Sequence, residues 1–185
     1  DIYYRLAELE MARKTYTTAL RLAQQPNANR QWSVQILRRM ADIDMQRLEW
    51  KQALRVYEQL RTLRPDDVSA RSNIIELNLR LAQPAQAHSE LLSYIEYLEG
   101  NKNSAQAIPF IEKLIEENDH PILRRELAAQ YHLVGRTSEA VTMLDAIGDQ
   151  LMEKGDKNGV REVITQILAM NPPNAEDYRN LLTQM

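Results

Sequence analysis

The sequence predicts an all-α fold, a stack of antiparallel helical hairpins with about nine helices. Apolar residues recur at helical spacing along almost the whole chain, for example at Ala53, Leu54, Tyr57 and Leu60. No stretch of the sequence alternates apolar and polar residues as a half-buried strand would. The composition agrees, because helix-favouring residues dominate, Gly numbers only 5, Pro numbers 7, and aromatic residues make up only 6%.

Clusters of turn-forming residues divide the helical pattern into segments. They lie at residues 26–29, 65–67, 83–84, 100–103, 119–121, 135–138, 155–159 and 172–174. Such short connections favour antiparallel neighbouring helices. Pro109 follows closely on a helix start expected near Ser104, so we predict a kink or a later start there.

Composition also narrows the classes of function. The formal net charge is −3 and the pI is about 5.7, whereas a domain that binds phosphates is expected to be basic, so we predict no nucleic-acid partner. Cysteine is absent, which removes disulfides, thiolate catalysis and zinc sites built on sulfur.

The sequence contains no apolar run of membrane-spanning length and no recognisable signal peptide, so we expect no membrane partner for this segment and a cytoplasmic location. The chain begins with Asp1 and enters a helical pattern at once, which favours a piece excised from a longer protein.

Small residues recur at a fixed interval. Ala19, Ala53 and Ala87 are spaced 34 residues apart. The second 34-residue window places further residues at defined positions, namely Leu37, Met40, Ala41, Asp44, Trp50, Ala53, Tyr57 and Pro65. Two later windows keep parts of the same pattern, namely Leu127, Ala128, Tyr131, Gly135 and Ala140, and then Ile147, Gly148, Leu151, Gly155 and Pro172.

This spacing resembles the tetratricopeptide repeat family, whose pattern runs W-x2-L-G-x2-Y, then A-x3-F, then P. Leu37, Ala41 and Asp44 stand where the family has W, G and Y. The resemblance implies a right-handed superhelix of hairpins in which Ala41 and Ala53 fill close helix crossings. It also implies one domain over residues 1–185, with repeats at about 1–31, 34–67, 68–100, 104–119 with 121–140, and 141–173, and a capping helix at 175–185.

The 34-residue phase is broken between Ala87 and Ala140, which are 53 residues apart. Our hypothesis is that residues 85–99 and 138–153 form long helices, each closing one hairpin and opening the next.

No motif indicates catalysis. His88, His120 and His132 lack partners at metal-ligand spacing, and residues 154–159 read as a turn because Lys157 interrupts any calcium-loop pattern. We therefore predict no enzyme, no catalytic residue, no cofactor and no metal.

The resemblance further implies a concave groove lined by the first helix of each hairpin. The residues expected to face it are Arg5, Gln35, Arg38, Arg39, Asp42, Asn73, Glu76 and Arg80. Arg5, Arg39 and Asn73 share one phase, and their side chains suit carboxylates and peptide backbones. The alternative interpretation is that these residues form the solvated faces of amphipathic helices.

The favoured function is a non-catalytic scaffold that binds a peptide or partner protein in this groove. One alternative is a sensor segment of a larger signalling or transcriptional regulator, and a weaker one is an RNA-binding helical repeat. Self-association through exposed ends of the array is also left open, since uncapped repeats expose apolar faces.

Overall fold

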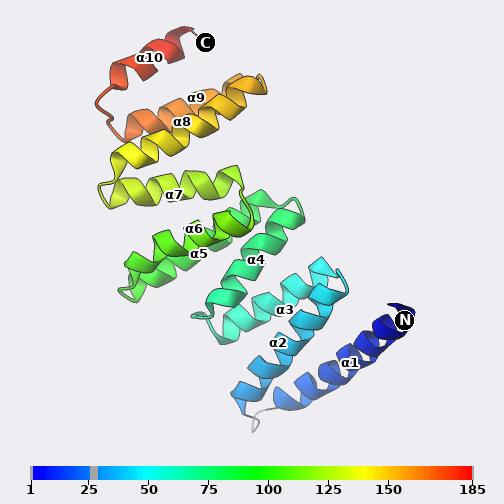
Figure 1. Cartoon of the computed structure of the whole chain (residues 1–185). Coiled ribbons are helices and arrows are strands. Elements are labelled where there is room, and N and C mark those ends of the chain that lie inside the picture. Colours follow the sequence, from blue (N-terminus) through cyan, green and yellow to red (C-terminus); the bar gives the residue numbers. More distant parts are fainter. Residues whose placement is uncertain (1, 26–28, 185) are drawn as a thin grey trace. The chain divides into compact units, whose positions relative to one another are not determined.

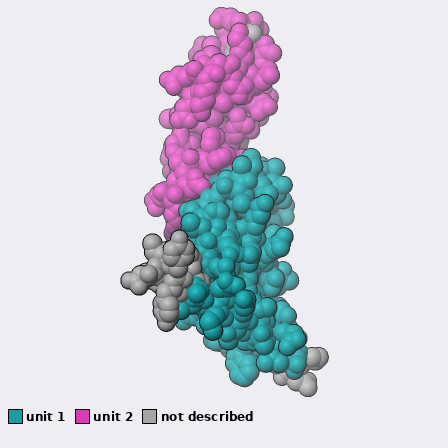
Figure 2. Space-filling view, turned by 90° about the vertical axis from the view of Figure 1, so that its right-hand side faces the viewer, with its two compact units in different colours: residues 1–100 teal, residues 101–185 magenta. Residues whose placement is uncertain are grey.

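The computed structural model describes residues 2–25 and 29–184, with side chains described for residues 7–25 and 29–184. Over the described backbone the chain is helical, with ten α-helices, one short 3₁₀ turn and no strand (Figure 1). None of these helices is both long enough and apolar enough to cross a bilayer. The chain divides into two compact units, residues 1–100 and 101–185, which are coloured separately in Figure 2. The expectation of a single domain stays a prediction.

Unit 1 is a series of antiparallel helices in which each helix packs on the next. Its helices are α1 (Ile2–Ala23), α2 (Arg30–Gln46), α3 (Trp50–Leu63), α4 (Val68–Arg80) and α5 (Pro84–Gly100). Asn29 and Asp67 cap α2 and α4, because their side chains accept hydrogen bonds from the backbone N–H groups of Gln31 and Ala70.

Unit 2 repeats the same sequential packing. Its elements are η1 (Ser104–Gln106), α6 (Ala107–Glu117), α7 (Pro121–Leu133), α8 (Thr137–Glu153), α9 (Lys157–Ala169) and α10 (Ala175–Gln184). The later start predicted at Pro109 is confirmed, because α6 begins at Ala107 and Pro109 falls in its first turn, where no helical amide partner is required.

Four of the turns that join consecutive helices share one backbone geometry. The central residue of each turn has a positive φ, namely Leu48 (57°), Ala82 (55°), Gly135 (82°) and Gly155 (72°). The next residue donates a hydrogen bond to a carbonyl five residues earlier in the chain, as from Glu49 N to Asp44 O (2.9 Å) and from Arg136 N to Tyr131 O (2.8 Å). This is a left-handed helix cap, and it reverses the chain in three residues.

Over the described residues there is one helix more than the nine expected, because the boundary between α2 and α3 was not predicted. Neither Gly nor Pro stands at residues 47–49, so the usual sequence marker of a helix end is missing. Leu48 instead adopts the left-handed conformation that glycine normally supplies, and its side chain is 65% exposed.

Small residues lie at the helix crossings of unit 1. Ala41 and Ala53 are 0% exposed and belong to one apolar cluster with Leu37, Leu60 and Leu77. The other repeat positions of this unit differ in burial: Ala87 and Tyr57 are buried, Ala19 and Trp50 are partly buried, and Pro65 is exposed.

Unit 2 buries the corresponding residues Ala128 and Ala140, and also Tyr131 and Pro172. Gly148 lies close to α9, since a Cβ added there would be 3.6 Å from Val163 Cγ1.

The two stretches predicted as long helices are each one continuous helix, α5 and α8. α8 packs on both α7 and α9, as the hypothesis requires of a helix shared by two hairpins. That α5 opens a second hairpin stays a prediction.

Candidate functional site

The exposed face of α2 carries four of the residues expected to line the groove. Gln35, Arg38, Arg39 and Asp42 follow the i, i+3, i+4, i+7 spacing of one helical face, and all four are exposed. The opposite face of α2 is buried in the core of unit 1 and includes Leu37. We call these four residues the α2 surface.

The α2 surface borders a first hollow toward α1. Its lining residues are Tyr16, Gln35, Ile36, Arg38, Arg39 and Asp42, and its volume is about 660 Å³. All four residues of the α2 surface therefore face this one space, which is large enough for side chains of a bound polypeptide.

A second hollow, of about 310 Å³, lies between α2 and α4. Arg38 crosses it, with Nη2 2.6 Å from Oδ2 of Asp67, whose other oxygen caps the N-terminus of α4. Arg38 and Asp42 line both hollows, so the α2 surface joins them.

Three residues of the α2 surface have no polar partner among the described side chains. Gln35, Arg39 and Asp42 make no side-chain hydrogen bond or ion pair within residues 7–25 and 29–184. Their amide, guanidinium and carboxylate groups can therefore bind an external partner without breaking a contact among these residues.

The α4 residues that were expected to line the groove make hydrogen bonds within α4. Asn73 Nδ2 donates to Ser69 O at 2.8 Å, and Arg80 Nε donates to Glu76 Oε1 at 2.9 Å. The Arg80 guanidinium also lies over the Trp50 ring, 5.1 Å from its centroid. The side chain of Arg5, the remaining nominated residue, lies outside the described residues.

Tyr57 of α3 forms part of the floor of the second hollow and is only 8% exposed. Burial, followed by the negative charges of Asp42, Glu76 and Asp67, raises the pKa of Tyr57 to about 12. The second hollow thus has two carboxylates, Asp42 and Asp67, and one arginine, Arg38, in its lining.

We expect the raised pKa of Tyr57 to lower stability at alkaline pH. The folded state holds this proton more tightly than the unfolded state, so the stabilisation is complete below pH 10 and is lost as the pH rises from 10 to 12. Between pH 9 and pH 11, Tyr57→Phe should lose about 1 kcal/mol less free energy of unfolding than the unaltered chain. Urea denaturation at both pH values measures this, and equal losses in the two proteins would contradict it.

Two of the histidines and the turn at residues 154–159, which were examined in the sequence as possible metal ligands, make hydrogen bonds at helix ends. His120 Nδ1 accepts a hydrogen bond from Ile122 N at 3.2 Å as the cap of α7, and Asp156 caps α9 through Gly159 N at 3.0 Å. His132 Nδ1 lies 3.0 Å from Thr137 Oγ1. Within the part of the chain that was described, no three His, Cys, Asp or Glu side chains are arranged to hold a metal ion.

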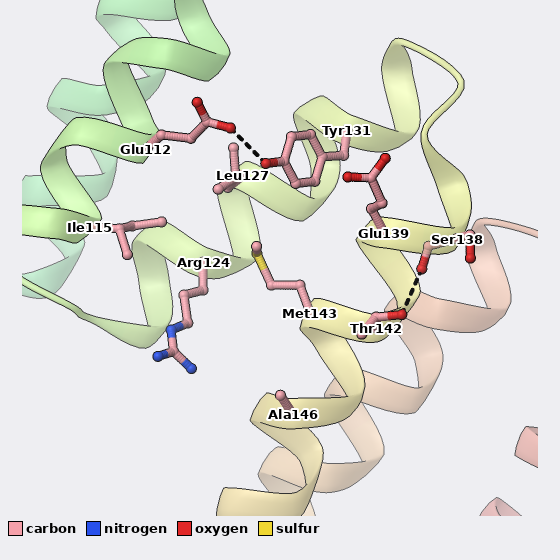
Figure 3. Close-up of a pocket in the computed structure, with 10 residues that line it drawn as sticks. All are labelled: Glu112, Ile115, Arg124, Leu127, Tyr131, Ser138, Glu139, Thr142, Met143 and Ala146. Carbon is pink, nitrogen blue, oxygen red and sulfur yellow. Dashed lines mark hydrogen bonds between the residues drawn. The ribbon is translucent and has the colours of Figure 1, made fainter.

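A cavity of about 610 Å³ in unit 2 was not anticipated from the sequence (Figure 3). It is lined by residues of α6, α7 and α8, namely Glu112, Ile115, Arg124, Leu127, Tyr131, Ser138, Glu139, Thr142, Met143 and Ala146. We call it the α6–α8 cavity. The sequence marked Tyr131 as a repeat position but gave no signal for the cavity, because its walls come from three helices that meet only in the folded unit.

No protein-family model matches the sequence, and no curated protein matches it. Among solved structures, the chain is similar to BtubC (BKLC) from P. vanneervenii, at 11% identity and a TM-score of 0.48, over 92% of this chain and 76% of that one. It is similar to a tetratricopeptide repeat protein from Parabacteroides merdae, at 18% identity and a TM-score of 0.39, over 98% of this chain and 79% of that one. For MamA the identity is 14% and the TM-score 0.32, over 74% of this chain and 97% of that one.

At these scores none of the three similarities assigns a function. The fold class follows from the helices themselves, which pack in consecutive antiparallel pairs and share a turn geometry in both units. The chain is a helical repeat protein that resembles tetratricopeptide arrays.

Proposed function

We propose that the chain is a non-catalytic interaction scaffold that binds a peptide or a partner protein at the α2 surface of unit 1. The observation that supports this function is that Gln35, Arg39 and Asp42 have no polar partner among the described side chains, beside two hollows that the α2 surface joins. Binding would order these exposed side chains at a cost of about 0.5–1.5 kcal/mol each, but it would break no contact among the described side chains.

The chemistry of the α2 surface suits an extended polypeptide. Arg39 offers a planar guanidinium that can pair with a carboxylate through two parallel hydrogen bonds. Asp42 can accept from an ammonium or a guanidinium, and Gln35 carries both a donor and an acceptor that match a peptide group. A segment that carries both charges and a free backbone edge would use all three residues.

A charge exchange tests the α2 surface without altering the net charge. The variant combines Arg39→Glu with Asp42→Arg, and the control combines Arg55→Glu with Glu58→Arg on the exposed face of α3. We expect proteins captured from an extract of the source cell by the unaltered chain and by the control to be absent from the captures with the α2 variant. A charge reversal within a protein interface typically costs several kcal/mol, so the loss should be nearly complete.

Circular dichroism and thermal melting of both variants establish that the fold is kept. Captured partners are then purified, and their affinities for the three proteins are compared by titration calorimetry. If the α2 variant captures the same partners with the same affinity as the control does, the proposed binding surface is wrong.

A further inference from the structure

The α6–α8 cavity has an apolar interior. Leu127 of α7 lies at its floor, and Met143 extends from α8 toward Leu127, while Ile115 and Ala146 contribute from α6 and α8 (Figure 3). Leu127 is only 3% exposed, so it belongs to the core of the unit as well as to the cavity. This interior suits an apolar group that enters from solvent.

Three of the polar side chains around this interior already have partners of their own. Thr142 Oγ1 donates to Ser138 O at 3.0 Å, Arg124 pairs with Asp119, and Glu139 pairs with Arg136. A small polar molecule would therefore find few groups that are free to fix its orientation.

Glu112 differs from these three side chains in how its charge is engaged. Its Oε1 accepts a hydrogen bond from the Tyr131 hydroxyl at 2.7 Å, which fixes the carboxylate at the edge of the cavity (Figure 3). Among the residues with described side chains it has no basic partner. The Arg136 guanidinium lies over the Tyr131 ring, 3.9 Å from its centroid, but it pairs with Glu139. Glu112 therefore keeps its negative charge beside the apolar interior without a direct basic partner among the described side chains, and a cation that contacts it would pair with that charge.

The net charge of unit 2 as a whole also favours a positively charged partner. Residues 101–185 contain nine basic and thirteen acidic residues, a formal net charge of −4. Glu116, which is exposed on α6 one turn after Glu112, adds to the negative potential near the cavity. A basic partner is thus attracted over a distance before it makes contact.

We propose that the α6–α8 cavity docks a short segment of a partner protein in which a bulky apolar side chain stands beside a lysine or arginine. The apolar side chain enters between Leu127 and Met143, and the basic group pairs with Glu112. An anchor in a pocket next to a charge pair is a common arrangement of binding hot spots. This site lies in unit 2 and does not depend on the α2 surface.

Three blocked hexapeptides test the proposal against the full chain, with affinity measured by fluorescence anisotropy. The first has two central leucines flanked by lysines, the second has glutamates in place of the lysines, and the third has alanines in place of the leucines. We expect the first peptide to bind at least tenfold more tightly than either of the others. Each peptide carries a fluorescent label, and titration with the chain up to 1 mM covers weak binding.

Variants of the chain locate the binding site. Glu112→Gln removes the charge but keeps an acceptor for Tyr131, and it should weaken binding of the lysine–leucine peptide at least fivefold. Ala146→Arg places a large cation at the exposed mouth of the cavity and should abolish binding. Ala169→Arg, at an exposed alanine of α9 outside the cavity, should leave the affinity unchanged.

Several results would overturn the proposal. One is the absence of binding by the lysine–leucine peptide at 1 mM, and another is equal affinity for the glutamate peptide. A third is an equal effect of Ala146→Arg and Ala169→Arg. Sedimentation of the unaltered chain as a dimer that Ala146→Arg dissociates would assign the cavity to a second copy of the chain instead.

Discussion

Replacing Glu90 with alanine is expected to lower the free energy of unfolding by about 3–5 kcal/mol. Glu90 is 5% exposed, its Oε1 lies 2.6 Å from Nη1 of Arg71, and its Oε2 pairs with Arg61. Arg71 is itself only 5% exposed, so the substitution leaves a buried guanidinium without its counter-ion. That uncompensated charge, more than the loss of the pair itself, accounts for the expected cost.

Arg71 cannot easily turn to solvent to relieve this cost. Its Nε donates to Pro65 O at 3.3 Å, and its guanidinium lies 5.4 Å and 5.9 Å from the ring centroids of Tyr94 and Tyr97. Glu90 thus joins Arg61 of α3 and Arg71 of α4 to α5, and its removal should loosen three helices together.

Urea denaturation followed by circular dichroism at 222 nm measures the effect. Glu96→Ala, at an exposed position on the same helix, is the control and should change the stability by no more than about 0.5 kcal/mol. Glu90→Gln keeps the shape and part of the hydrogen bonding, so it should fall between the two. A loss below 1 kcal/mol in Glu90→Ala would show that Arg71 finds another partner.

The sequence could not predict this ion cluster. Glu90 and Arg71 are 19 residues apart, and each looks like one of many charged residues on an amphipathic helix. Their burial depends on how α3, α4 and α5 approach one another, and no local pattern encodes that approach. The same reason explains why the α6–α8 cavity was missed. The ion pair between Glu76 and Arg80 is different, because it follows from the i,i+4 spacing on α4 alone.

The fold was more accessible to sequence reasoning than the site. Helical periodicity and turn residues are local signals, and they located all helix boundaries except the one at Leu48, where a leucine adopts the conformation usual for glycine. For the groove, the phase of α2 brought Gln35, Arg38, Arg39 and Asp42 to one surface, because side-chain direction on a single helix follows from spacing alone.

A large loss of stability is also expected when a buried alanine at a repeat position is enlarged. Ala53→Leu is expected to lower the free energy of unfolding by about 1–3 kcal/mol, because the added atoms have no space at a close helix crossing. Ala53 is 0% exposed on α3, and it belongs to the same cluster as Ala41 of α2 and Ala70 of α4, which are 0% and 1% exposed. Overpacking there must displace a helix or force a side chain out of its preferred rotamer.

The same substitution at an exposed alanine separates overpacking from any general effect of leucine. Ala85→Leu on α5 is exposed and should change the stability by no more than about 0.5 kcal/mol in urea denaturation. Ala140→Leu, at the 0% exposed position of unit 2, should behave like Ala53→Leu, because both alanines hold the same place in the repeat. If both buried variants are as stable as the Ala85 control, the alanines at the repeat positions do not reflect close helix packing.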